Sequence, residues 1–90
     1  MEKAKTIKIE RVQTGVRLEK SLVKVLKGLA EYLDMSLGDL LEGMALHAFE
    51  GKAPFSPETK AAIENLKEIY GCKLDATMAH RLEESRHAKP

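Results

Sequence analysis

The residues best suited to contact another molecule stand in the stretch VQTGVRL, residues 12–18. Apolar or small side chains alternate there with polar ones; the first set is Val12, Thr14, Val16 and Leu18, and the second is Gln13, Gly15 and Arg17. A glutamine amide both donates and accepts hydrogen bonds, and an arginine donates in a planar fork that fits two acceptors at once. Because side chains of a strand point alternately to opposite faces, the pattern predicts a strand with these two groups on its polar face.

The positive charge of the chain is concentrated around this stretch. Residues 1–18 hold five basic and two acidic residues, a net charge of +3, whereas residues 19–51 hold three basic and six acidic residues, a net charge of −3. The formal total for the whole chain is only +1. A basic segment of this kind favours an anionic partner, and a solubilising basic tail is the alternative explanation.

The other titratable residues do not form a catalytic or metal-binding pattern. His80 and His87 would lie two turns apart on a helix, roughly 10 Å by helical rise, which is too far for both to bind one metal ion. His47 and Cys72 do not complete a metal-ligand spacing, and a single cysteine excludes an internal disulfide. The chain also lacks a Ser-His-Asp or Cys-His signature and a glycine-rich phosphate loop. We therefore expect no enzymatic activity, no metal and no cofactor.

Beyond residue 20 the apolar residues recur every three or four positions, which is the spacing of amphipathic helices. A first helix is predicted from Leu22 to near Asp34. A second opens with Ser36 as its N-cap and ends at Gly51. Residues 12–51 therefore predict one strand followed by two helices.

The C-terminal part, residues 52–90, predicts one or two additional helices. In the sequence FSPET, Ser56 is the expected N-cap and Pro57 occupies the first helical position, where its missing N–H costs nothing. Gly71 is placed to end this helix, and a short last helix is expected from Asp75. The apolar stripe of the longer helix consists of Ile63, Leu66, Ile69 and Tyr70. We expect this stripe to pack back onto the rest of the protein, and binding of a partner protein is the alternative.

A single short strand has unpaired N–H and C=O groups along both edges and is not stable alone. No second strand of comparable quality is present, so the best partner is the same segment of a second copy; a hairpin turning at Thr14-Gly15 is the competing interpretation. A 90-residue domain also leaves much apolar surface in water, which favours a homodimer. The expected dimer core consists of Val12, Thr14, Val16, Leu18, Leu26, Leu41, Ala45 and Phe49.

The sequence QTGVRLEKSLVKVLKGLAEYLDMSLGDLLEGMALHAF, residues 13–49, resembles the ribbon-helix-helix DNA-binding proteins of the Arc, MetJ and CopG type. The resemblance implies a mainly α fold in which the short N-terminal strand pairs with its copy in an intertwined dimer. Residues 1–11 would then be a basic N-terminal arm, 12–51 the DNA-binding motif and 52–90 a C-terminal helical extension. The implied function is a sequence-specific transcriptional regulator of the repressor type, which inserts a two-stranded antiparallel ribbon into the major groove of double-stranded DNA.

The same resemblance implies the DNA-contacting residues. The base-contacting set would be Gln13, Gly15 and Arg17, since arginine can bind guanine O6 and N7, glutamine can bind adenine, and glycine permits close backbone approach. The family also binds a phosphate at the N-terminus of its second helix, where free N–H groups favour an anion. The expected phosphate-binding residues are Ser36, Leu37, Gly38, Lys3, Lys5, Lys8 and Arg11. Two residues depart from the family pattern: Asp34 stands where a glycine is usual, and Asp39 adds a carboxylate.

Antitoxins of this family join a DNA-binding ribbon to a C-terminal segment that covers a toxin. An alternative function is therefore a protein-interaction module whose residues 52–90 bind a partner protein. The chain has no apolar run long enough to span a bilayer and no signal-peptide pattern at its start. We accordingly expect a cytoplasmic location and no membrane contact.

Overall fold

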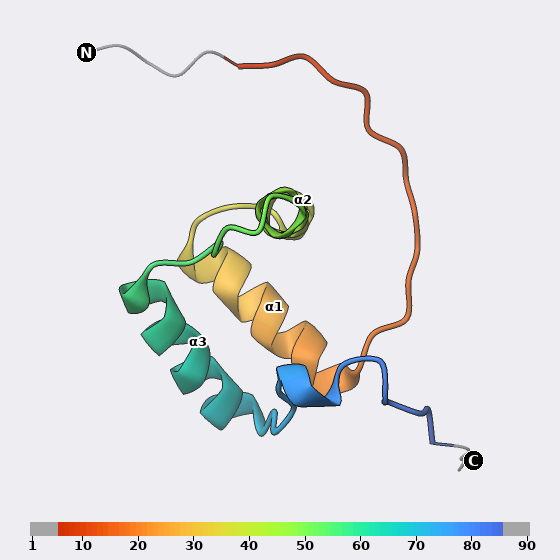
Figure 1. Cartoon of the computed structure of the whole chain (residues 1–90), viewed down its shortest axis with the longest axis vertical. Helices are drawn as coiled ribbons and strands as arrows, with labels where there is room; N and C mark the ends of the chain where they lie inside the picture. Colours follow the sequence, from red (N-terminus) through yellow and green to blue (C-terminus); the bar gives the residue numbers. More distant parts are fainter. Residues whose placement is uncertain (1–5, 86–90) are drawn as a thin grey trace.

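The computed structural model describes residues 6–85, which form three α-helices and one short 3-10 helix. The helices are α1 (Lys20–Tyr32), α2 (Leu37–Phe49), α3 (Pro57–Tyr70) and η1 (Ala76–Met78), as Figure 1 shows. The mainly α character is consistent with the sequence. α1 lies in the middle, with α3 packed along it and α2 crossing near its C-terminal end.

The starts of the helices follow from local capping chemistry. Ser36 and Ser56 are the N-caps of α2 and α3 as predicted, and each hydroxyl accepts the N–H three residues ahead, at 3.0 and 3.2 Å. α1 begins at Lys20, two residues before the predicted start at Leu22. The reason is that the Glu19 carboxylate accepts the Leu22 N–H at 2.8 Å and so caps the helix earlier.

All three helices end in the same hydrogen-bonded turn, with one residue in the left-handed conformation. That residue is Gly51 after α2 and Gly71 after α3, with φ of 70° and 67°. After α1 it is Asp34, with φ of 59°. In this turn the Asp34 N–H donates to Glu31 O at 3.1 Å and the Met35 N–H to Ala30 O at 2.9 Å, which is the Schellman pattern. Asp34 therefore adopts a conformation that L side chains disfavour.

The core lies between α1, α2 and α3. Its buried side chains are Leu26, Leu29, Ala30 and Leu40, surrounded by the partly buried Leu22, Leu33, Leu37, Met44, Phe55, Ile63 and Leu66. The predicted packing of the α3 stripe onto the protein is thus confirmed for Ile63 and Leu66. Farther along the same helix, Ile69 is 69% exposed. The α1–α3 contact is much more extensive than the α1–α2 contact.

The predicted strand over residues 12–18 is wrong, and so is the ribbon-helix-helix fold class with its intertwined ribbon. No strand occurs anywhere between residues 6 and 85. Residues 6–19 run instead as an open arc outside the helices, with every residue exposed (Figure 1). No other part of the described chain offers this segment a ladder of N–H and C=O groups, so neither a strand nor the competing hairpin forms.

The predicted last helix is also shorter than expected. It is reduced to η1, which Asp75 caps by accepting the Thr77 N–H at 3.0 Å. His80 follows with a positive φ of 69°, which turns the backbone out of helical geometry. Leu82, in the stretch that follows η1, is 54% exposed.

Candidate nucleic-acid interface

The exposed residues 6–19, here called the N-terminal segment, carry half of the predicted DNA-contacting residues. The three predicted base-contacting residues and two predicted phosphate-binding residues in it are Gln13, Gly15, Arg17, Lys8 and Arg11, all of them exposed. Lys3 and Lys5 lie outside the described residues. The segment leads directly into the N-terminus of α1, so the helices fix its C-terminal end.

An open cleft of about 770 Å³ separates the N-terminal segment from α1 and α2. Arg11, Gln13 and Gly15 line it from the segment, and Leu37 and Gly38 line it from the first turn of α2. The remaining lining is largely apolar and includes Val23, Leu26 and Leu41. The structure therefore brings two predicted base-contacting residues together with part of the predicted phosphate site. Arg17 and Ser36 do not line this cleft.

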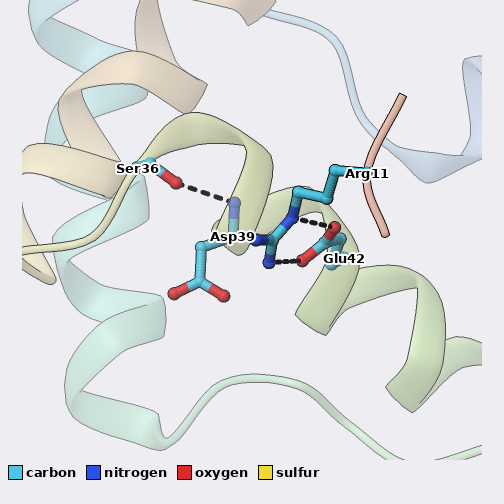
Figure 2. Close-up of polar contacts among 4 residues, drawn as sticks. All are labelled: Arg11, Ser36, Asp39 and Glu42. Atoms are coloured by element: carbon cyan, nitrogen blue, oxygen red, sulfur yellow. Dashed lines mark hydrogen bonds and ion pairs between the residues drawn. The ribbon is translucent and has the colours of Figure 1, made fainter. Parts of the chain in front are cut away.

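Arg11 is held against α2 by Glu42. Its Nε donates to Oε2 at 2.8 Å and its Nη2 donates to Oε1 at 2.7 Å, as Figure 2 shows. The hydrogen bonds from Arg11 hold the pKa of the Glu42 carboxyl below its usual value. The same bonds, with a smaller contribution from the charge of Asp39, raise the pKa of Arg11. The guanidinium thus offsets negative charge at the start of α2.

The N-terminus of α2 presents both favourable and unfavourable groups to an anion. The N–H groups of Leu37 and Gly38 lie in the first turn, where no intrahelical acceptor is available. The Ser36 hydroxyl already accepts the Asp39 N–H, and the Asp39 carboxylate stands in the same turn (Figure 2). Arg11, which interacts with the charge of Asp39, therefore offsets part of the negative charge of this turn.

Arg17 contacts a different part of the chain, the C-terminal stretch 79–85. Its Nε donates to Oε1 of Glu84 at 3.3 Å, and its Nη2 forms an ion pair with Oε2 of the same carboxylate. Hydrogen bonding to Glu84 raises the pKa of Arg17. Sequence reasoning missed both Glu42 and Glu84. The excess of acidic residues in 19–51 indicated that a carboxylate there could pair with the basic segment, but it did not single out Glu42. Nothing in the sequence indicated Glu84.

One face of α2 is apolar and exposed, and it runs from Leu41 beside the cleft to Phe49 at the end of the helix. Leu41, Ala45 and Phe49 recur at helical spacing, and all three are exposed, Phe49 to 80%. Leu40 is the only buried residue of α2. Of the predicted dimer core, Leu26 is instead buried within its own chain, and the four residues in the N-terminal segment are exposed.

The histidines are not gathered into a metal site. His47 donates from Nδ1 to the carbonyl oxygen of Gly43 at 2.8 Å, in the tautomer that carries the proton there. Among residues 6–85 no three His, Cys, Asp or Glu side chains are grouped so that they could hold a metal ion. His87 lies outside the described part of the chain.

Comparison of the chain with protein-family models, with curated proteins and with solved structures gave no match. Among the helices of the described residues, none has the length and apolar character needed to cross a membrane. The candidate interface is therefore defined by the chemistry and geometry of this chain alone.

Proposed function

We propose that this protein is a sequence-specific DNA-binding transcriptional regulator that acts as a homodimer. The observation that carries the proposal is the N-terminal segment, an extended stretch that stands outside the helices with every residue exposed. It presents Lys8, Arg11 and Arg17 together with the Gln13 amide. Cationic side chains on an exposed segment can bind phosphates while neighbouring polar groups reach base edges.

In this proposal, Gln13 and Arg17 contact bases and Gly15 lets the backbone approach the DNA closely. Lys8 and Arg11 bind phosphates. The first N–H groups of α2 bind a phosphate beside Arg11, which neutralises part of the Asp39 and Glu42 charge. The segment acts as a single extended chain, not as a paired ribbon.

The uncovered face of α2 supports the homodimer. Leu41, Ala45 and Phe49 form an apolar stripe in water, and large exposed apolar patches mark interaction sites. Packing two copies through this stripe would remove it from water in both chains. A two-fold dimer would present two N-terminal segments, so its binding site would be roughly palindromic.

The test is selection from a genomic fragment pool by the purified full chain at two salt concentrations, followed by sequencing. We expect an enriched, roughly palindromic site that Arg17→Ala no longer selects. The matched control is Arg81→Ala, which removes the same charge from a residue outside the N-terminal segment. Retention of DNA without sequence preference, with no difference between the two variants, would contradict the proposed function.

A second candidate is a protein-interaction module. The specific observation in its favour is that Ile69 and Leu82, both in residues 52–90, are exposed to 69% and 54%. Co-purification from cells, with wild type compared with Ile69→Ser and Leu82→Ser, separates the candidates. A stable partner that both variants lose favours the module. Sequence-selective DNA binding that survives both substitutions favours the regulator.

A further inference from the structure

Arg11 and Arg17 of the N-terminal segment are both occupied by carboxylates from distant parts of the chain. Glu42 holds Arg11 across 31 positions of sequence, and Glu84 holds Arg17 across 67 positions. The two carboxylates belong to different kinds of local structure. Glu42 belongs to α2 and is fixed by that helix, whereas Glu84 lies beyond η1 in a stretch without helix or strand.

The Glu84 contact uses donors that a base could also use. Nε and Nη2 of Arg17 both point to the Glu84 carboxylate. A bidentate arginine contact to guanine, or to a phosphate, can use this same Nε–Nη2 edge of the guanidinium. Glu84 and DNA therefore compete for this edge of Arg17, because the edge cannot serve both acceptors at the same time.

We infer that Glu84 is an intramolecular competitor of DNA for Arg17, so that the C-terminal stretch 79–85 is an autoinhibitory contact. The inference rests on the proposed function, because it concerns the regulation of the same arginine. A carboxylate on the same chain competes at a high effective concentration, without any other molecule. Weakly attracting DNA would leave the contact in place, and a site that also satisfies Gln13 and Lys8 would displace it.

The exposure of the pair sets the size of the effect. The side chains of Arg17 and Glu84 are 82% and 68% exposed, so water and salt screen their attraction. Exposed ion pairs change an equilibrium by about fivefold at most. Removing Glu84 should therefore strengthen DNA binding by roughly two- to fivefold at low salt, and by less at high salt.

The chain supplies a matched control in the neighbouring residue. Glu83 and Glu84 carry the same charge, but among the described residues only Glu84 forms an ion pair with Arg17. Glu83→Gln and Glu84→Gln therefore change the net charge equally. A difference between them reports the specific contact and not the general loss of negative charge.

The experiment measures fluorescence anisotropy of a labelled random-sequence DNA duplex with the full-length variants, at about 50 mM and about 200 mM salt. We expect Glu84→Gln to bind more tightly than Glu83→Gln and wild type at the lower salt. Adding Arg17→Ala to Glu84→Gln should abolish the gain, since the competitor then has no target. In NMR spectra of the free protein, Glu84→Gln should shift the Arg17 Nε–H signal, and Glu83→Gln should not.

Each contrary result has its own meaning. Equal affinities of Glu83→Gln and Glu84→Gln, with DNA bound by both, would overturn the competition and leave DNA binding intact. An Arg17 Nε–H chemical shift that is the same in wild type and Glu84→Gln would also overturn the competition. Absence of DNA binding by wild type and every variant at the lower salt would overturn both the competition and the proposed function.

Discussion

A methyl group placed on the α-carbon of Gly28 would lie 3.0 Å from Cδ2 of Leu66 and 3.5 Å from Cε2 of Tyr70. α1 and α3 therefore approach each other at a position where the glycine backbone is in direct contact with side chains of the other helix. This contact lies in the most extensive helix pairing of the protein. The spacing of α1 and α3 is therefore sensitive to side-chain volume at residue 28.

We expect Gly28→Leu to lower the free energy of unfolding by about 1–3 kcal/mol, because the new side chain must push α3 away from α1. The matched control is Gly43→Ala in α2, since nothing lies within 4 Å of a methyl group at that position. Alanine there should raise the free energy of unfolding by roughly 0.5–1 kcal/mol through helix propensity. Urea denaturation followed by circular dichroism measures both. A stable Gly28→Leu protein would contradict the close helix contact.

Asp34→Gly should stabilise the protein. Asp34 has a φ of 59° in a turn whose equivalents after α2 and α3 are glycines. Removing the steric cost of a side chain in this conformation should raise the free energy of unfolding by about 0.5–1 kcal/mol, after allowing for the greater entropy of glycine in the unfolded chain. Asp34→Asn is the control, because it removes the charge but keeps a side chain. Equal stabilisation by both variants would assign the effect to charge.

The Arg11–Glu42 pair should give a defined pH dependence. Because the pKa of Glu42 is lowered in the folded protein, its stabilising contribution is present above the unfolded value of 4.5 and is lost as the pH falls through the folded pKa. Arg11→Gln should return the pKa of Glu42 toward 4.5, as measured by NMR titration of its carboxyl group. Lys8→Gln removes a charge from the same segment and should leave that pKa unchanged. If the pKa of Glu42 were the same in wild type and Arg11→Gln, the pairing would be disproved.

Phe49→Ser should weaken self-association. Phe49 is 80% exposed in a single chain, and burying an aromatic side chain is a common source of interface affinity. We expect the dimer dissociation constant, measured by analytical ultracentrifugation, to rise about tenfold or more. Ile69→Ser on α3 is the control, because it removes an exposed apolar side chain outside the proposed interface. Two variants with the same sedimentation behaviour as wild type would argue against a dimer through α2.

The helices could be predicted because their ends depend on short-range chemistry. Ser36 and Ser56 cap helices through hydroxyls that bind an N–H only three residues away. Gly71 ends α3 because it adopts a positive φ at low cost. Each of these features needs only a few consecutive residues. The apolar stripe of α3 was likewise visible as spacing, and Ile63 and Leu66 pack as that spacing predicted.

The early start of α1 and the short last helix are local errors, whereas the predicted strand and the missed carboxylates concern contacts between distant residues. Alternation over residues 12–18 reported which side chains share a face, but a strand also needs a neighbour, and the described chain provides none. Glu42 and Glu84 meet Arg11 and Arg17 across 31 and 67 positions, so their pairing depends on how the helices pack. Of the candidate site, the sequence could therefore identify the basic segment but not the carboxylates that occupy it.

α2 has a single buried residue, Leu40, and this predicts which helix of the protein unfolds locally first. Releasing α2 breaks a smaller contact than separating α1 from α3, so α2 is the α-helix of lowest local stability. In amide hydrogen exchange, the α2 protons of a lone chain should exchange before those of α1 and α3. Association of two copies through Leu41, Ala45 and Phe49 would reverse this order. The helix that is held most weakly in one chain would then become the best-protected part of the pair.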